Sequence, residues 1–220
     1  MEILKTILKE NYLVFDVGSN IGNKAETYLA HNTKVVGFEP QPNCINKLNN
    51  RFKHNTKYIL EPIGLAETKG VTTIYESNAH TISSMSKEFI DTVSKERFKG
   101  YSWPRKIEVN VDTLDSMITK YGQPNYIKID VEGYEFNVLK GLTTPVDLIS
   151  IEFTPELSST SVDCINYMES INGECIYNYG YREDTFFKFD NWLNKKEMLN
   201  YITSVKDYRV EFGDIYIKKV

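Results

Sequence analysis

The sequence predicts an α/β fold with a mostly parallel, seven-stranded sheet, helices on both faces and an antiparallel hairpin at the C-terminal end. The first observation is a strand–helix–strand–helix–strand pattern with short connections over residues 12–60. This pattern is typical of parallel strands joined by crossover helices. The second is a change near the end of the chain, where short β-type runs follow one another with a single helix among them. Together they predict a parallel core that finishes in a hairpin.

Apolar periodicity places the elements of the first part of the chain. The expected elements are a helix at 2–10, strands at 12–15, 34–38 and 57–60, and helices ending near 30 and 52. Asn20 or Asn23 is expected to cap the second helix, since both are favourable N-cap residues. Pro40 and Pro42 mark the turn into the third helix, because proline is favoured in a first helical turn.

The later elements are read in the same way. Strands are expected at 71–75, 107–111, 126–129, 147–153, 174–178, 185–189 and 214–218, and helices at 113–121, 134–139, 162–171 and 195–201. Gly141 is expected to close the helix at 134–139 as a C-cap. The polar segment at about 76–106 is an insert without a clear pattern, expected to form a lid or part of a binding region. The whole chain, 1–220, is expected to form one domain.

Composition narrows the class of protein. Of 220 residues, 41% are hydrophobic and 25% charged, which is typical of a globular domain. The net charge of −4 argues against nucleic acid or an anionic membrane as a partner. Cys44, Cys164 and Cys175 have no zinc-site spacing, and no signal-peptide or membrane-spanning pattern is present. These features predict a soluble, cytoplasmic protein without integral membrane association, and they leave its oligomeric state open.

A glycine-containing turn follows the first strand, in the segment VFDVGSNIGN. The strand delivers Asp16 to the carboxyl edge of the sheet, and two glycines allow the backbone to approach a ligand closely. Backbone N–H groups at the start of the next helix suit a carboxylate or phosphate. The spacing G-x-x-x-G differs from the G-x-G-x-x-G that binds a pyrophosphate. Asp16, Gly18, Ser19, Asn20 and Gly22 are therefore candidate cofactor-binding residues.

A second candidate site begins at Glu39, which ends the next strand and is followed by Pro40. A carboxylate in this position can accept hydrogen bonds from both ribose hydroxyls of an adenosine moiety. After the third strand, Ile63, Gly64 and Leu65 are expected to line the adenine pocket.

A third motif, YIKIDVEGYEFNVLKGL, contains the most apolar strand of the chain, which ends at Asp130 and is followed by Glu132 and Gly133. These carboxylates are expected near the sheet edge that carries Asp16 and Glu39. Acidic side chains gathered there need compensation by protons, donors or a ligand cation. A ligand with a sulfonium and an ammonium group would supply it.

The motifs together resemble the FkbM family of methyltransferases. DVGSNIG, GFEPQPN, VDTLD, IKIDVEGYEFNVLKG and ISIEF follow in this order between Leu13 and Phe153. The resemblance implies a Rossmann-like class I methyltransferase fold, S-adenosylmethionine as the methyl donor, and O-methylation of a hydroxyl. It also implies a small-molecule or glycan acceptor, such as a sugar, a glycan or a glycosylated natural product. The insert and the region after residue 153 lie outside the resemblance.

Methyl transfer to a hydroxyl calls for a base, because an aliphatic hydroxyl is a poor nucleophile at neutral pH. Asp130, Glu132 and His80 are the candidate catalytic residues, and Asp130 is alternatively a partner of the cofactor's amino group. Glu152 could join Asp130 and Glu132 around Mg²⁺ or Mn²⁺, but the sequence requires no metal and none is predicted. Aromatic residues expected to stack on a sugar are Tyr101, Trp103, Tyr179, Tyr181, Phe186 and Phe187.

Two other functions remain open from the residues alone. A nicotinamide-dependent oxidoreductase could use the same sheet and Glu39, although the third glycine and a Tyr-x-x-x-Lys pair are missing. A binding protein could keep the fold and the cofactor but lack catalysis. A nucleic-acid methyltransferase is disfavoured by the acidic balance and by the lack of an amine-methylating N/D-P-P-Y/F motif.

Overall fold

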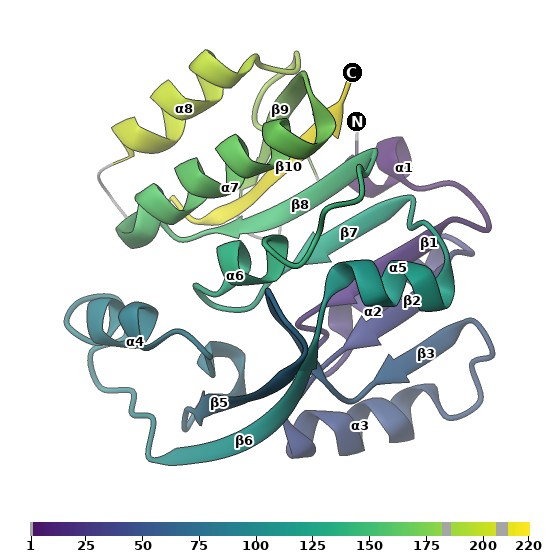
Figure 1. The fold of residues 1–220 in the computed structure, drawn as a ribbon, viewed down its shortest axis with the longest axis vertical. Helices are drawn as coiled ribbons and strands as arrows, with labels where there is room; N and C mark the ends of the chain where they lie inside the picture. Colours follow the sequence, from purple (N-terminus) through teal and green to yellow (C-terminus); the bar gives the residue numbers. More distant parts are fainter. Residues whose placement is uncertain (1, 182–185, 206–210) are drawn as a thin grey trace.

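The protein, as a computed structural model, is described over residues 2–181, 186–205 and 211–220. The main sheet is built from β1 (Leu13–Val17), β2 (Lys34–Phe38), β3 (Tyr58–Glu61), β7 (Tyr126–Ile129), β8 (Leu148–Phe153), β9 (Cys175–Tyr181) and β10 (Gly213–Lys219). The strand order is β3-β2-β1-β7-β8-β10-β9 (Figure 1). β10 is antiparallel to β8 and β9, whereas the other neighbours are parallel. The predicted fold class is confirmed.

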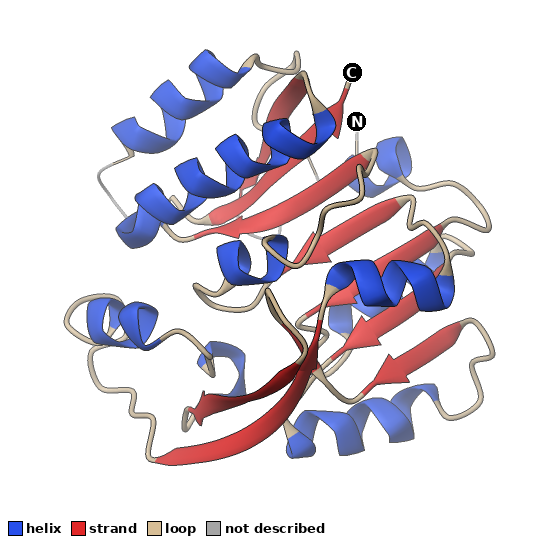
Figure 2. Cartoon of the chain, in the orientation of Figure 1, coloured by secondary structure: helices blue, strands red, loops and turns tan. Residues whose placement is uncertain are grey.

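Helices cover both faces of the sheet, as predicted (Figure 2). One face packs against α5 (Leu114–Tyr121), α6 (Glu135–Leu139), α7 (Ser158–Asn172) and α8 (Lys195–Ser204). The other packs against α1 (Ile3–Ile7), α2 (Asn23–Ala30) and α3 (Pro42–Phe52). Within the described ranges, no helix has both the length and the apolar character needed to cross a bilayer.

The two faces of the sheet differ in chemistry. Alternate residues of the central strands, such as Phe15, Ile127 and Ile149, are buried against α5–α8 and form an apolar core. The opposite face carries a buried polar row that runs in register across five strands. Its members are Asp16, Lys128, Ser150, Tyr216 and Asn178. The sheet therefore brings hydrogen-bonding groups to its interior at the level of the strand ends.

The insert is flanked in the sequence by the strands of a second, smaller sheet. Its strands, β4 (Gly64–Leu65), β5 (Gly70–Glu76) and β6 (Arg105–Asp112), lie in the order β4-β6-β5. Between β5 and β6 come a short 3₁₀ turn, η1 (His80–Ile82), and α4 (Lys87–Val93). α4 lies beyond the carboxyl ends of β7 and β8 (Figure 1). The segment expected to lack a clear pattern is thus ordered and lies over the sheet edge that carries the candidate site.

Helix ends follow local side-chain chemistry, with two departures from expectation. α5 and α8 begin as their sequences suggest, with Thr113 and Asn194 accepting hydrogen bonds from backbone N–H groups of the first turn. Neither Asn20 nor Asn23 caps α2, because the N-cap is Gly22 with a left-handed backbone and no side-chain cap. Gly141 is not the C-cap of α6, which is Lys140.

The remaining differences lie near the ends of the chain. α1 is shorter than the expected helix at 2–10. Of the strand expected at 185–189, Thr185 lies outside the described residues, and Phe186 and Phe187 form isolated bridges to Glu2 and Gly180. The hairpin partner of β9 is β10, so the long connection between them holds α8.

Candidate active site

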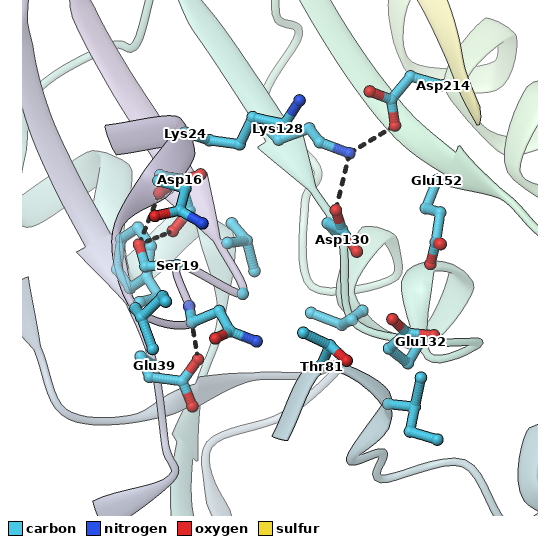
Figure 3. A pocket seen from close by; sticks show the side chains of 18 of the residues that line it. Asp16, Ser19, Lys24, Glu39, Thr81, Lys128, Asp130, Glu132, Glu152 and Asp214 are labelled. Carbon is cyan, nitrogen blue, oxygen red and sulfur yellow. Dashed lines mark hydrogen bonds and ion pairs between the residues drawn. The ribbon is translucent and has the colours of Figure 1, made fainter. Parts of the chain in front are cut away.

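A cavity of about 1120 Å³ opens at the carboxyl ends of β1, β2 and β7 (Figure 3). Pockets for one small ligand usually hold roughly 300–1000 Å³, so this volume suits two ligands side by side. Nine of the eleven predicted cofactor residues line it: Asp16, Gly18, Ser19, Asn20, Glu39, Pro40, Gly64, Leu65 and Asp130. His80 and Glu132 line it as well.

The glycine turn is held by Asp16 at the end of β1. Ser19 Oγ donates to Asp16 Oδ2 at 2.7 Å, and the Asp16 side chain is almost fully buried. Burial raises the pKa of Asp16 to about 6. Gly18 has a φ of +86°, and a Cβ there would overlap the carbonyl oxygen of Asp130. This close approach brings the end of β7 against the turn, and only glycine allows it.

Two of the predicted cofactor residues lie behind the cavity wall. Gly22 contacts Phe52 and Leu48 of α3, so its missing side chain serves helix packing. Ile63 packs against the main hydrophobic core. The neighbouring Gly64 and Leu65 face the cavity from β4.

Glu39 is buried at the end of β2, and each of its oxygens accepts one backbone hydrogen bond. Asn20 N donates to Oε2 at 2.8 Å and Gln41 N donates to Oε1 at 2.8 Å. Burial raises the pKa of Glu39 to about 7, although these two donors act in the opposite direction. The carboxylate lines the cavity, where a carboxylate can accept hydrogen bonds from a ligand's hydroxyls.

The raised pKa of Glu39 predicts a pH dependence of stability in the ligand-free protein. Between its ordinary pKa of 4.5 and about 7, the folded state binds more protons than the unfolded state. Stability therefore falls as pH rises through this window, by roughly 3 kcal/mol from Glu39 alone. We expect thermal unfolding midpoints to decrease between pH 5 and 8 in the native protein and to change less in Glu39→Gln. Equal slopes for the two proteins would contradict the assignment.

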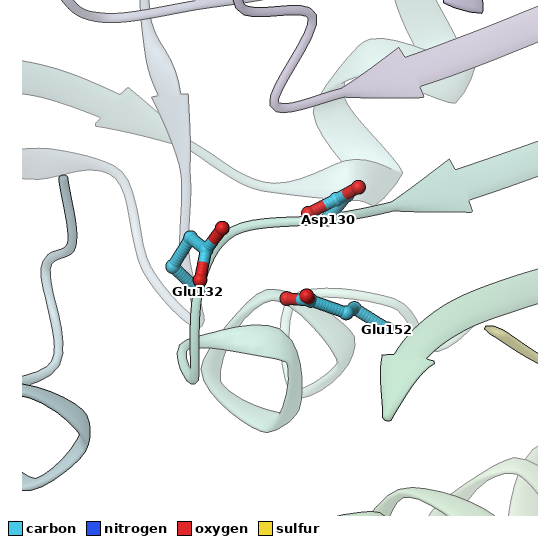
Figure 4. Close-up of side chains that lie close together, drawn as sticks. All are labelled: Asp130, Glu132 and Glu152. Carbon is cyan, nitrogen blue, oxygen red and sulfur yellow. The ribbon is translucent and has the colours of Figure 1, made fainter. Parts of the chain in front are cut away.

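Three carboxylates converge on the other side of the cavity (Figure 4). Asp130 follows β7, Glu132 follows Asp130 by two residues, and Glu152 comes from β8. One oxygen of each lies within 4.8 Å of the other two. Burial and the neighbouring carboxylates raise the pKa values of Glu132 and Glu152 well above their ordinary range. Such a cluster can share a proton at neutral pH and take another from a ligand.

Glu132 reaches the cavity by a strained turn. Its backbone has a φ of 55°, in the left-handed region that non-glycine residues rarely adopt. Ser84 of the insert donates to the Glu132 carbonyl at 2.6 Å and is itself fully buried. The insert thus holds the turn in place.

The backbone of His80 lies at the glycine turn. Its carbonyl accepts hydrogen bonds from the side-chain amides of Asn20 at 3.4 Å and Gln41 at 3.3 Å. Its imidazole Nδ1 is buried without a hydrogen-bond partner among the described residues. Burial and the charge of Lys47 lower the pKa of His80. The structure therefore brings Asp130 and Glu132 together and places the third base candidate at the cofactor turn.

The aromatic residues that line the cavity are not those named from the sequence as possible sugar contacts. Tyr179 is in the core, Trp103 packs under α4, and Phe187 packs on Trp192 and Tyr216. The aromatic residues at the cavity are Tyr28, Phe38, Phe98, Phe212 and Tyr216. Sequence reasoning also missed the cationic residues Lys24, Arg97 and Lys128. For Lys128 a signal existed, namely a lysine inside the most apolar strand of the chain.

A seven-stranded sheet in this order, with a glycine turn and acidic strand ends around one cavity, defines the class I methyltransferase fold. The chain belongs to the FkbM methyltransferase family, since the model of the methyltransferase FkbM domain matches residues 16–202. This confirms the resemblance found in the sequence, and it favours a methyltransferase over a nicotinamide-dependent enzyme.

Comparison with individual proteins finds similarity to the hexuronic acid methyltransferase AglP of Haloferax volcanii, with 25% identity over 159 residues. The match covers 68% of this chain and 59% of AglP, so the chain spans about three fifths of that relative. The precorrin-6Y C5,15-methyltransferase of Geobacter metallireducens GS-15 superposes with a TM-score of 0.49 at 10% identity, covering 99% of this chain and 85% of its own. An rRNA methylase of Streptococcus thermophilus gives 0.46 at 11% identity, with 99% and 92% covered.

Proposed function

We propose that the protein is an S-adenosylmethionine-dependent O-methyltransferase that acts on a hydroxyl of a sugar or glycan. The observation that carries the proposal is Glu39, whose buried carboxylate lines the cavity at the end of β2 and is held there by the backbone N–H groups of Asn20 and Gln41. A carboxylate in this place suits the two hydroxyls of a ribose. The family membership supports the choice of cofactor.

The cofactor half of the cavity follows from the residues around Glu39. The turn from Gly18 to Asn20 would hold the methionine part, and Gly64 and Leu65 would lie along the adenine. Asp16 stabilises the turn through Ser19. When bound, S-adenosylmethionine supplies a sulfonium methyl group, which passes to the acceptor oxygen and leaves S-adenosylhomocysteine.

The acceptor half would lie at the carboxylates of Asp130, Glu132 and Glu152. A base with a raised pKa suits a hydroxyl nucleophile at neutral pH, because its pKa lies closer to that of the group it deprotonates. We assign Glu132 as the base that takes the acceptor proton while the oxygen–methyl bond forms. Glu152 and Asp130 would hold the hydroxyl in line with the methyl group. His80, at the glycine turn, would serve the cofactor instead.

The choice of a sugar acceptor rests on the similarity to AglP, a hexuronic acid methyltransferase. The cavity supports an acceptor of moderate size, since its volume of about 1120 Å³ exceeds that of a pocket for one ligand.

Calorimetric titration with S-adenosylmethionine and S-adenosylhomocysteine tests the cofactor. We expect micromolar binding by the native protein and an at least tenfold weaker affinity in Glu39→Ala, a loss of about 1.4 kcal/mol. Glu26→Ala is the matched control, because Glu26 is exposed on the helix that follows the turn and pairs with Arg51. Absence of binding by folded native protein would refute the proposal. Binding without turnover across sugars, uronic acids and glycosylated compounds would favour the non-catalytic alternative.

The same carboxylates are also a set of oxygen donors of the kind that Mg²⁺ or Mn²⁺ takes. Carboxylates that share a proton and carboxylates that bind a metal ion predict different effects of EDTA on methyl transfer. If Glu132 acts as the base alone, methyl transfer survives EDTA and shows no response to added Mg²⁺ or Mn²⁺. Loss of turnover in EDTA, restored by one of these ions, would replace the base assignment with a metal site.

A further inference from the structure

Lys128 occupies an unusual position at the centre of the sheet. It is the third residue of β7, between Ile127 and Ile129, and its side chain is 2% exposed. Its ammonium nitrogen lies 2.5 Å from Asp214 Oδ1 on β10 and 3.3 Å from Asp130 Oδ2 at the end of β7 (Figure 3). Lys128 also lines the cavity. A lysine is almost never fully buried unless it is paired, and here one ammonium serves two carboxylates.

The two partners of Lys128 differ in their surroundings. The side chain of Asp214 is 12% exposed, whereas that of Asp130 is 37% exposed and faces the cavity. Asp130 presents Oδ2 to Lys128, which leaves Oδ1 for other partners. Asp130 also belongs to the cluster with Glu132 and Glu152. Asp214, the buried partner, is therefore held within the sheet. Asp130, the more exposed partner, reaches the proposed acceptor site.

We propose that Lys128, anchored by Asp214, is a positioning residue that fixes the orientation of Asp130 toward the acceptor hydroxyl. This inference rests on the proposed function. Asp130 follows the last residue of its strand, where the backbone alone leaves the carboxylate free to rotate. An ion pair with the anchored ammonium restricts that freedom, and a displacement of about 1 Å at a reacting group can lower the rate about 100-fold.

The charges that face Lys128 come from several elements. Asp16 lies beside it on β1 and Asp214 on β10, while Lys24 approaches from α2 and Glu152 from β8. Burial alone would lower the pKa of Lys128, but Asp130 and Asp214 hold it well above the usual value. Lys128 therefore stays charged across the working pH range. Its charge also counteracts the raised pKa values of Glu132 and Glu152.

A purely structural role is the alternative. In that case Lys128 neutralises the buried Asp214, and its removal is harmful because it leaves an unpaired charge in the interior. The positioning role and the structural role of Lys128 can be separated, because in the double variant Asp214 is replaced by the neutral Asn and no longer needs a cation. Lys128→Met keeps the length of the side chain, and Asp214→Asn keeps the shape of its partner.

The experiment compares Lys128→Met, Asp214→Asn and the double variant in full-length protein. Thermal unfolding reports stability, calorimetry reports S-adenosylmethionine affinity, and kcat is measured over pH 5–9 with the best acceptor. We expect Lys128→Met to be destabilised and the double variant to regain most of that stability. The kcat values of Lys128→Met and of the double variant are expected to be about 100-fold below that of Asp214→Asn. Their affinity for S-adenosylmethionine should stay within threefold of native, about 0.65 kcal/mol. In these two variants the acid limb of the profile of kcat against pH should move to higher pH.

A double variant whose kcat and pH profile match those of Asp214→Asn would overturn the inference and leave Lys128 a structural role. A loss of cofactor affinity with unchanged kcat would also overturn it. Absence of cofactor binding or turnover in the native protein would instead mean that the proposed function fails, and the native control detects this before any variant is compared.

Discussion

Replacement of Glu132 by glutamine is expected to lower kcat by roughly 100- to 10,000-fold, the usual contribution of a general base. The amide keeps the size of the side chain but cannot accept a proton. The cofactor half of the cavity lies at β1 and β2, so affinity for S-adenosylmethionine should stay within threefold of native, about 0.65 kcal/mol. Single-turnover rates with saturating cofactor and acceptor measure the chemical step directly.

Glu132→Gly adds a readout that separates catalysis from folding. The left-handed backbone at Glu132 costs roughly 1–2 kcal/mol for a residue with a Cβ and little for glycine. The glycine variant should therefore lose kcat as the glutamine variant does but unfold at a temperature about 2–8 °C higher than the glutamine variant. Such a result would show that the left-handed backbone at Glu132 lowers the stability of the protein while it directs this carboxylate into the cavity. Wild-type kcat in either variant would exclude Glu132 as the base.

Replacement of Gly18 by alanine is expected to have the largest effect on both folding and cofactor binding. The added Cβ would meet the carbonyl of Asp130 in a backbone conformation that already disfavours a side chain, since φ is +86°. Either the turn moves away from β7 or Asp130 moves away from Lys128. We expect an unfolding midpoint lower by about 10 °C and an affinity for S-adenosylhomocysteine at least 100-fold weaker, about 2.7 kcal/mol.

Gly100→Ala is the matched control for this prediction. Gly100 has a φ of +107°, but nothing lies within 4 Å of a Cβ built there. It therefore isolates the backbone strain, roughly 1–2 kcal/mol, from the clash with Asp130. Equal destabilisation in the two variants would show that the contact between the turn and the end of β7 carries no energetic weight.

The sequence predicted most of the fold because the signals there are local. Strands at 34–38 and 126–129 were placed at their observed bounds, since each is a short apolar run between turn residues. The cap of α2 was not predicted, because Asn20 has a left-handed backbone and uses its amide toward His80 instead. The structure of the insert was missed because its stability comes from contacts made far along the chain, such as that of Ser84 with Glu132.

For the candidate site, the sequence indicated which residues end a strand but not which side chains meet. Asp16, Glu39 and Asp130 follow strands that pair in parallel, so their common edge could be predicted. The role of Asp214 could not, because β10 enters the sheet from the other end of the chain and runs in the opposite direction. His80 was named as an alternative base without a predicted position, because its place depends on the course of the insert.

The carbonyl of His80 accepts one amide from the glycine turn and another from the start of α3. Asn20 and Gln41 use their side chains for this carbonyl and their backbone N–H groups for the Glu39 carboxylate. A shift of η1 would therefore act first on the two residues that hold Glu39 in place.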